Sequence, residues 1–475
     1  MKKLYRYLAC LLIVQNASVA AVTEKTFLSN APTSNFNYYY LRDLWLQNLE
    51  LKNRHDIGGR VLLRTAYHQS YNQQGLGRYF GVNDKPNIVI GERINDASPA
   101  AIVNATTVDI DERFIIHGQA LPVASGTVSF KPQHEIFTAI VSYEQSLNAL
   151  VKGLWVWLFV PVEHVTRRLQ YSICSGNTTV GTDLTNFFTG NFSSDLQVPL
   201  TNAKLAQRKS TTGLGDIELG IRYDIVNKQI LKMDMGLRGI IPCANKPTGK
   251  FLFEPLRGHE GHGAIGFDIQ ASRLIYDNFS TTLQFVGMFD ALYFFSTDQK
   301  RTLGIKNRRL GQYVLLGQAG QTKLLPAANV LTMPLRIAGY TELSASCGLN
   351  GNHYGWFGSL NYQLKTREEE CIKIKNCWNN TTYAVSSFSF DGDQFGASPN
   401  DFDLYANDWI TQQDLDFQAA TTPGFLLHEI DLILGKVVDL GSQTLLFSAG
   451  FSAEFSGRNF PAKSWGVEIG IGVSF

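Results

Sequence analysis

The sequence predicts an all-β protein, a transmembrane antiparallel up-and-down β-barrel of about 12 strands. Three observations support this prediction. A strand with two different faces ends the chain, the same pattern recurs upstream, and short and long connections alternate between the predicted strands. Alternation of side chains with a period of two is typical of a strand whose faces meet different surroundings.

The length and the charge of the chain restrict its class. It has 475 residues, which suits one large barrel, and its formal net charge is +1. A charge this close to neutral provides no basic field for nucleic acid, so we exclude nucleic acid as a partner. A bundle of membrane helices would need several apolar runs of roughly 20 residues, which the composition argues against.

The N-terminus has the features of a cleavable signal peptide. Lys2, Lys3 and Arg6 precede a short apolar core at residues 8–14, and Ser18, Val19 and Ala20 provide the small residues of a cleavage site. We therefore expect a signal peptide at residues 1–20, an N-terminal periplasmic or plug segment at 21–57, and the barrel at 58–475. The second segment could also supply a helix or an extra strand.

The last strand is the clearest element in the sequence. Its apolar face consists of Val467, Ile469, Ile471, Val473 and Phe475, and its other face consists of Gly466, Glu468, Gly470, Gly472 and Ser474. This ending resembles the terminal strand of bacterial outer-membrane β-barrel, porin-like proteins, without indicating a specific family. The resemblance implies a bacterial outer membrane, contact with its lipid, and recognition of Phe475 by the barrel assembly machinery.

Similar two-faced segments precede the last strand and bring the number of predicted strands to twelve. The upstream segments are 59–71, 127–146, 153–163, 214–226, 229–241, 263–276, 280–295, 331–347, 353–366, 424–436 and 444–456. Each is long enough to cross a bilayer, which takes about 9–11 residues of a tilted strand. Residues 108–116 and 310–317 could add two strands, so fourteen is the alternative.

The connections between these segments predict the orientation of the barrel. Those at 147–152, 227–229, 277–279, 348–352 and 437–443 are short, and most of the connections that alternate with them are long and polar or rich in glycine. Outer-membrane barrels have short periplasmic turns and long external loops. We therefore expect the short connections to face the periplasm.

Charges of both signs fall on the predicted inner face. They either line a wet pore and set its selectivity, or pair across strands and hold a narrow interior together, and the interleaving of signs favours pairing. The candidates are Arg60, Arg64, Glu144, Asp216, Glu218, Arg222, Asp224, Lys232, Asp234, Arg238, Asp268, Asp290, Arg336, Glu342, Lys365, Glu429, Asp431, Glu454 and Glu468.

Other candidate sites are weaker. Cys371 and Cys377 could form a local disulfide or remain free thiols. His259, Glu260 and His262 lack the helical spacing of a zinc motif, so we predict no metal and no cofactor. His428 is expected on the lipid-facing side of its strand, but no serine joins it there for a lipase-like reaction. We therefore predict that the chain is not an enzyme.

Three functions fit this sequence. The first is a channel or porin-like protein for the passive passage of small solutes. The second is a closed structural or surface-binding barrel, an adhesin or receptor, that acts through its external loops. The third is a hydrophobic-compound uptake channel of the fatty-acid-transporter type. Residues 74–78 resemble the hatch of that class, although they follow the first predicted strand.

Overall fold

The computed structural model describes residues 24–29, 58–83, 85–91, 109–111, 115–116, 126–175, 178–278, 280–385, 409–458 and 463–475. The predicted signal peptide therefore lies outside the described residues. Of the segment predicted at 21–57, only residues 24–29 lie within them.

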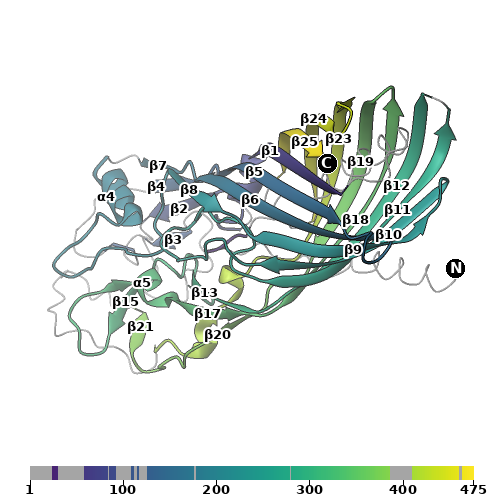
Figure 1. Ribbon diagram of the computed structural model, residues 1–475. Coiled ribbons are helices and arrows are strands. Elements are labelled where there is room, and N and C mark those ends of the chain that lie inside the picture. The colour runs from purple at the N-terminus through teal and green to yellow at the C-terminus, as the bar shows by residue number, and fades with distance from the viewer. Residues whose placement is uncertain are drawn as a thin grey trace, which may run out of the picture.

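Twelve antiparallel strands close into a barrel (Figure 1). They are β1 (Gly59–Ser70), β5 (Gln133–Ser146), β6 (Leu154–Arg168), β9 (Ile217–Asn227), β10 (Leu231–Ile241), β11 (Ala264–Asp277), β12 (Thr281–Phe294), β18 (Tyr340–His353), β19 (Trp356–Arg367), β23 (Phe425–Asp439), β24 (Thr444–Arg458) and β25 (Ser464–Ser474). Each strand pairs with its neighbour along the chain, and β25 returns to pair with β1. The prediction of a 12-strand up-and-down barrel is confirmed.

The two ends of the barrel sequence meet at the closing seam. Gly59 N–H donates to the carbonyl oxygen of Phe475 at 2.9 Å, and Phe475 N–H donates to the carbonyl oxygen of Gly59 at 3.0 Å. A sheet that closes on itself has no edge, so its backbone groups are satisfied without water. The C-terminal residue is therefore part of the wall.

The period of two in the sequence separates an outer face from an inner face. On β19, Leu360 is 53% exposed while Asn361 is only 1% exposed, and on β25 Ile469 is 60% exposed while Glu468 is 8% exposed. The same division holds on the other barrel strands, where large apolar side chains point outward. An apolar belt of this kind requires lipid around it. The chain is therefore a membrane-spanning barrel.

One rim of the barrel, which we call the short-turn rim, has only brief connections. They lie at 147–153, 228–230, 278–280, 354–355 and 440–443. The tightest joins β18 to β19 through Tyr354 and Gly355, whose φ angles are 48° and 81°. Two left-handed residues are what a two-residue hairpin turn needs to match the twist of its strands. The prediction of short connections at this rim is confirmed.

The opposite rim carries a folded cap, defined as the described residues of the connections 71–132, 169–216, 242–263, 295–339 and 368–424. Figure 1 shows its elements gathered at one end of the barrel. Its strands are β2 (Asn87–Gly91), β3 (Ile110–Asp111), β4 (Gly126–Ser129), β7 (Ser172–Ser175), β8 (Arg208–Leu214), β13 (Thr297–Thr302), β14 (Gly304–Ile305), β15 (Leu315–Gln318), β16 (Leu325–Pro326), β17 (Thr332–Ile337), β20 (Ile372–Ile374), β21 (Tyr383–Val385) and β22 (Leu415–Asp416).

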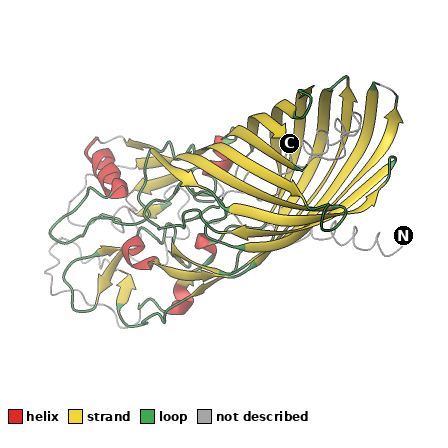
Figure 2. Ribbon diagram, viewed as in Figure 1, coloured by secondary structure: helices red, strands yellow, loops and turns green. Residues whose placement is uncertain are grey.

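The helices among the described residues are short and lie in the cap (Figure 2). They are α3 (Gln73–Gly77), α4 (Thr178–Thr189) and α5 (Ala327–Leu331), with 3-10 turns η4 (Gln412–Asp414) and η5 (Gln418–Ala420). In the part of the chain that the structure describes, no helix has both the length and the apolar character needed to cross a membrane.

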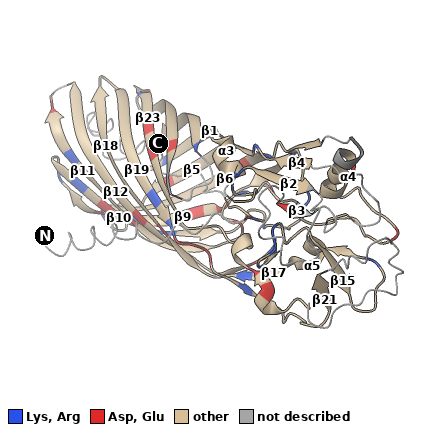
Figure 3. Cartoon of the chain, turned by 180° about the vertical axis from the view of Figure 1, so that it is seen from behind, with Lys and Arg blue, Asp and Glu red and all other residues tan. Residues whose placement is uncertain are grey.

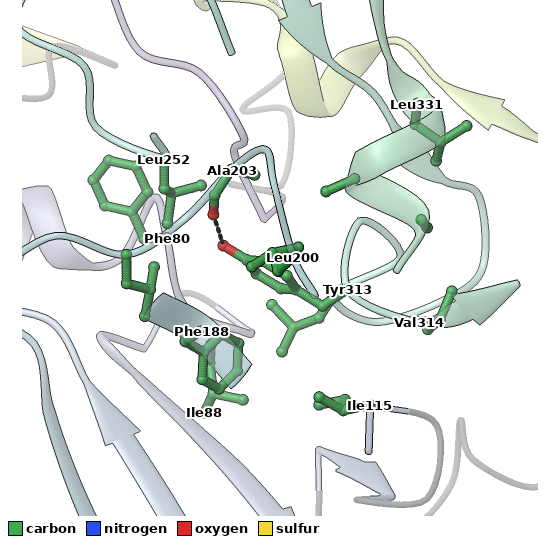
Figure 4. Close-up of a cluster of buried hydrophobic side chains, with 14 of the residues drawn as sticks. Phe80, Ile88, Ile115, Phe188, Leu200, Ala203, Leu252, Tyr313, Val314 and Leu331 are labelled. Atoms are coloured by element: carbon green, nitrogen blue, oxygen red, sulfur yellow. Dashed lines mark hydrogen bonds between the residues drawn. The ribbon is translucent and has the colours of Figure 1, made fainter. Parts of the chain in front are cut away.

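The cap has a hydrophobic core of its own. Figure 4 shows Phe80, Phe188, Leu200 and Leu252 packed with Tyr313, whose hydroxyl donates to the carbonyl oxygen of Ala203 at 2.7 Å. These side chains come from different long connections, so the loops fold together instead of extending separately into solvent. Because side chains in close-packed cores move little, the core makes the cap a defined body over the rim.

Two boundary predictions were wrong for local reasons, and the alternative of two further barrel strands is also answered. The segment 127–146 divides into β4 and β5 around Pro132, which has no N–H to donate to a ladder. The segment 331–347 divides at Ala338 and Gly339: β17 joins β13 and β20 in the cap, and only β18 enters the barrel. The two extra strands weighed at 108–116 and 310–317 correspond to β3 and β15, which also belong to the cap.

We expect the outer face of the barrel to reject charge in a way that depends on depth. Leu360→Arg, within β19, should destabilise the folded barrel by about 2–4 kcal/mol, because a guanidinium there must enter the hydrocarbon. Leu440→Arg, in a turn of the short-turn rim, should cost about 0–1 kcal/mol and serves as the control. Urea unfolding in lipid vesicles measures both, and equal losses would contradict the assigned membrane position.

Candidate functional site

The inner face of the barrel holds ion pairs that bridge neighbouring strands. Figure 3 marks positions of positive and negative residues along the barrel strands. Arg60 on β1 pairs with Glu144 on β5, and Arg64 Nε lies 3.9 Å from Glu468 Oε2 on β25. The Arg60 guanidinium also lies over the ring of Trp155, 5.0 Å from its centre. These pairs are buried, so their partners depend on each other for solvation.

A larger network crosses β9, β10, β11 and β12. Arg222 contacts Asp234 at 3.2 Å and Asp268 at 2.5 Å. Arg238 contacts Glu218 at 3.4 Å and Asp290 at 2.6 Å. Arg222 on β9 thus connects acids of β10 and β11, and Arg238 on β10 connects acids of β9 and β12, which fixes the register of this part of the wall.

The wall formed by β18, β19, β23 and β24 contains more acids. Lys365 Nζ lies 2.8 Å from Glu342 Oε1. Glu429 and Glu454 occupy opposite positions in the β23–β24 ladder, and Asp431 follows on the same inner face. Like charges opposite each other destabilise a ladder unless other groups compensate them.

The remaining predicted interior residues divide into three places. Asp224 and Lys232 lie on the barrel strands near the short-turn rim. Asp216 lies just before β9, at the cap end of the wall. The prediction that Arg336 faces the barrel interior was wrong. The chain leaves the cap only at Tyr340, so Arg336 lies in β17 of the cap, where its half-exposed side chain pairs with Asp298 at 3.1 Å.

The interior is filled rather than wide. Asn350, Asn361 and Gln363 face inward, yet each is at most 1% exposed. A buried apolar cluster also faces inward, and on β12 and β23 its members Val286 and Ile433 lie nearer the short-turn rim than the acids do. A wide aqueous pore would leave such side chains exposed, so the described walls border no wide path in this conformation.

The loop at 242–263 is anchored to the barrel by Asp216. One carboxylate oxygen accepts the N–H groups of Cys243 and Ala244, each at 2.9 Å, and the other lies 3.0 Å from His259 Nδ1. Burial by itself would lower the pKa of His259, but the bond and the negative charge of Asp216 raise it. Burial would raise the pKa of Asp216, and its hydrogen bonds, chiefly that from His259, lower it.

A second anchor is a buried cluster of charges where the cap meets the barrel. Arg301 Nη1 lies 2.6 Å from Glu370 Oε2, and Arg301 Nη2 lies 3.4 Å from Glu260 Oε2. Arg367 Nη2 lies 3.3 Å from the other oxygen of Glu370. Despite burial, the two arginines lower the pKa of Glu370 to about 2, so this carboxylate stays ionised.

Residues 24–29, the N-terminal segment, pass through the middle of this junction. Their backbone joins two loops, because Lys25 N–H donates to Tyr79 at 2.7 Å and Thr26 N–H donates to Ala419 at 2.8 Å. The ring of Phe27 lies 3.6 Å beneath the guanidinium carbon of Arg301. The segment is thus at the cap end of the barrel, opposite the rim at which β1 begins.

The first described residue of the N-terminal segment, Glu24, carries a perturbed carboxyl group. It accepts the N–H of Leu310, and the ion pair of Arg309 with Asp109 lies close to it. Burial raises the pKa of Glu24 to about 7, and the Leu310 bond and Arg309 offset only part of that effect. Docking of the segment is therefore linked to a proton near neutral pH.

Other candidate groups have ordinary surroundings. Cys371 and Cys377 are both free and exposed, so the structure shows the unpaired alternative. Within the described ranges, no group of three or more His, Cys, Asp or Glu residues is arranged to hold a metal ion. His428 lies on the outer face, and its Nδ1 is 2.6 Å from the hydroxyl of Tyr362.

The residues that hold the cap were not found by sequence analysis. Arg301, Glu370 and Arg367 lie in or beside polar loops, where a buried charge and a solvated charge look the same in sequence. The N-terminal segment meets residues 393 positions away, as in the bond from Lys25 to Gln418. The one available signal was the strongly apolar content within some loops, such as the run at residues 313–316.

No known family model matches the sequence, and no curated protein matches it. Solved structures with a similar fold include an outer-membrane channel from Pseudomonas putida F1, at 10% identity over 88% of this chain and 96% of that one, with a TM-score of 0.41. The Pseudomonas putida toluene transporter TodX has 8% identity over 94% of each chain and a TM-score of 0.34.

A third similar structure is the translocator domain of the autotransporter NalP from Neisseria meningitidis, at 10% identity over 93% of this chain and 97% of that one, with a TM-score of 0.29. At these identities the similarities assign no function to the chain. Its own closed barrel, apolar outer face, short turns and long loops place it in a bacterial outer membrane.

The Asp216–His259 pair predicts a pH limit on the loop at 242–263. The folded pKa of His259 is raised, so its contribution is fully present below about 6.5, the ordinary value, and is lost as pH rises through the folded pKa. Asp216→Asn should lower the pKa of His259, because the effect of burial remains while the bond to the carboxylate and its negative charge are lost. Histidine-selective NMR in micelles measures it, and an unchanged pKa in that variant would refute the assigned cause.

The Glu24 carboxyl predicts that docking of the N-terminal segment weakens as pH rises. Its folded pKa of about 7 exceeds the ordinary 4.5, so the docked form loses stability across that interval and changes little above it. Hydrogen exchange at the amides of Lys25 and Thr26, corrected for intrinsic rates, should be faster at pH 8 than at pH 5. Glu24→Gln should remove the difference, whereas a persisting difference would assign the effect elsewhere.

Proposed function

We propose that this protein is an outer-membrane channel for small solutes, closed in this conformation by its cap and filled interior. The observation that carries the proposal is the polar inner face of a closed barrel whose outer face is apolar. A barrel of about eight strands is filled by its side chains and one of sixteen leaves a channel, so twelve strands allow a narrow path.

The two halves of the inner wall differ in a way that suits passage. The strands β9 to β12 carry the arginine–carboxylate network, whereas β18, β19, β24 and β25 place small or neutral polar side chains between their inward charges. Examples are Ser346, Asn361, Ser448 and Gly470. The paired charges hold their half of the barrel rigid, and the small side chains of the other half leave room for a solute once the filled interior rearranges.

The cap is the element that controls access. It is a folded body with its own core, and Glu370 joins it to the barrel by contacting both Arg301 of the cap and Arg367 at the end of β19. Passage from outside therefore requires the cap to shift at this junction. The proposal assigns no chemical reaction to the chain.

The interior argues against uptake of hydrophobic compounds as the first choice. Apolar clusters exist in the cap and toward the short-turn rim, but charged residues such as Asp290, Glu342 and Lys365 lie between them along the wall. A hydrophobic solute would have to cross that band. A purely surface-binding barrel remains the main competitor, since the cap core could support a binding face.

Single-channel recording on the full exported chain in planar bilayers tests the proposal. The wild-type protein should show small or rare openings. Glu370→Gln should raise the open probability several-fold, because a buried ion pair that loses one partner is destabilised by about 3–5 kcal/mol. Asp298→Asn is the control, since its exposed bonds to Arg336 and Lys375 in the same small sheet contribute little.

Folding of each variant is checked by heat-dependent migration on gels. Glu370→Gln that folds but conducts no more than wild type would separate the cap from gating. Absence of conductance from both proteins at every voltage would overturn the channel proposal and favour a surface-binding barrel.

A further inference from the structure

The strongest unassigned feature of the interior is a group of basic side chains on β1, β5 and β6, just beneath the N-terminal segment. Arg167 and His134 are direct partners in the β5–β6 ladder. His68 lies on the inner face of β1, opposite Ile136, which is two residues from His134 on β5. Arg64 lies on the same face of β1, four residues before His68. The basic side chains therefore form a row along this part of the wall.

Arg167 is held in place with one edge free. Its Nη1 donates to the carbonyl oxygen of Leu28 at 3.1 Å, and its guanidinium carbon lies 4.6 Å from the centre of the Phe253 ring. Nε and Nη2 are buried and have no hydrogen-bond partner in the part of the chain that the structure describes. These two atoms form the edge of a guanidinium that binds a carboxylate or a phosphate through two parallel bonds.

The imidazole of His134 is in a similar state. The residue is 7% exposed, and neither ring nitrogen has a hydrogen-bond partner among the described residues. Nδ1 of His68 and Nη1 of Arg64 are also buried without a partner there. A buried polar group without a partner is costly, and four such residues in one row are uncommon unless a ligand satisfies them.

Most of the acids near this row have hydrogen-bond or ion-pair partners, Glu254 with Thr248 among them, although Glu260 Oε1 has none among the described residues. Glu135 points to Arg168 at 3.1 Å, Glu163 accepts the N–H of Gly258 at 2.8 Å, Glu260 faces Arg301 at 3.4 Å, and Glu468 lies 3.9 Å from the far end of the row at Arg64 Nε. The row therefore has more N–H donors than acceptors near it, which is the chemistry that recognises an anion.

We propose that Arg167, His134 and His68 form a binding site for a small oxyanion, with a carboxylate as the ligand that best fits a single guanidinium edge. The Arg167 edge binds both carboxylate oxygens, and the ring N–H of His134 donates to one of them. The inference deepens the proposed function, because it names small carboxylates as the solutes that the channel would hold just inside its cap.

Binding can be measured without conduction. The purified full chain in detergent is titrated with sodium acetate, and with sodium phosphate as a second oxyanion, against sodium chloride at equal ionic strength. Acetate should raise the melting temperature in a saturable way and give a dissociation constant in the millimolar range by calorimetry. Phosphate binding tighter than acetate would identify phosphate as the preferred oxyanion, whereas equal stabilisation by all three salts would overturn the site.

Two variants and a matched control locate the site. Arg167→Gln should weaken acetate binding at least tenfold. His134→Leu leaves the bond from Arg167 to Leu28 intact, and should weaken binding several-fold while raising the melting temperature of the ligand-free protein, since it removes unsatisfied nitrogens. Arg168→Gln, on the next residue, removes an arginine that pairs with Glu135, and should bind acetate as wild type does.

The outcomes separate this inference from the channel proposal. Wild-type affinity in both Arg167→Gln and His134→Leu would show that the row only supports the N-terminal segment, and the inference would fail. Acetate binding that these variants abolish, in a protein that never conducts, would retain the site and refute the channel. Conductance without saturable acetate binding would support the channel and refute the carboxylate site.

Discussion

The absence of water in a bilayer is the constraint on which this structure depends. A strand in hydrocarbon must pair every backbone N–H and C=O group, so the sheet has to close, and the bonds between Gly59 and Phe475 complete that closure. Once the sheet is closed, the pleat decides where every side chain points. Apolar residues such as Leu360 and Ile469 face lipid, and charged residues such as Arg222 and Glu468 share one interior.

Burying so many charged groups inside the barrel removes them from water at a cost in free energy, and ion pairs between them offset this cost. Arg222 and Arg238 each contact acids of two strands, so the charges are solvated by one another and also fix the register. The row at Arg167 and His134 is one place among the described residues where buried polar atoms have no hydrogen-bond partner. The paired charges of β9 to β12 thus stabilise the wall, whereas the N–H groups of the row on β1, β5 and β6 that are unpaired within the described chain are the ones proposed to bind an anion.

The cap also exists because apolar side chains have to be buried, in this case those of the long loops at the rim opposite the short turns. Long loops would expose many apolar side chains if each stood alone, and packing them together buries residues such as Leu315 and Leu331 completely. Burying that surface also buries the charges at the junction, so Arg301 and Glu370 must pair, and the N-terminal segment contributes the ring of Phe27 to their surroundings. The same contacts therefore stabilise the cap and hold it over the end of the barrel.

The sequence by itself determined the barrel, because a period of two and a bilayer thickness act locally on each strand. It predicted all twelve strands, the short turns and the inward position of residues such as Arg222 and Glu468. Only the tertiary structure decided how the loops fold, where residues 24–29 lie, and that Arg336 belongs to the cap. Those features depend on contacts between segments hundreds of residues apart, such as Thr26 with Ala419, which no local pattern encodes. The row of Arg64, His68, His134 and Arg167 is likewise assembled by strand register rather than by a motif.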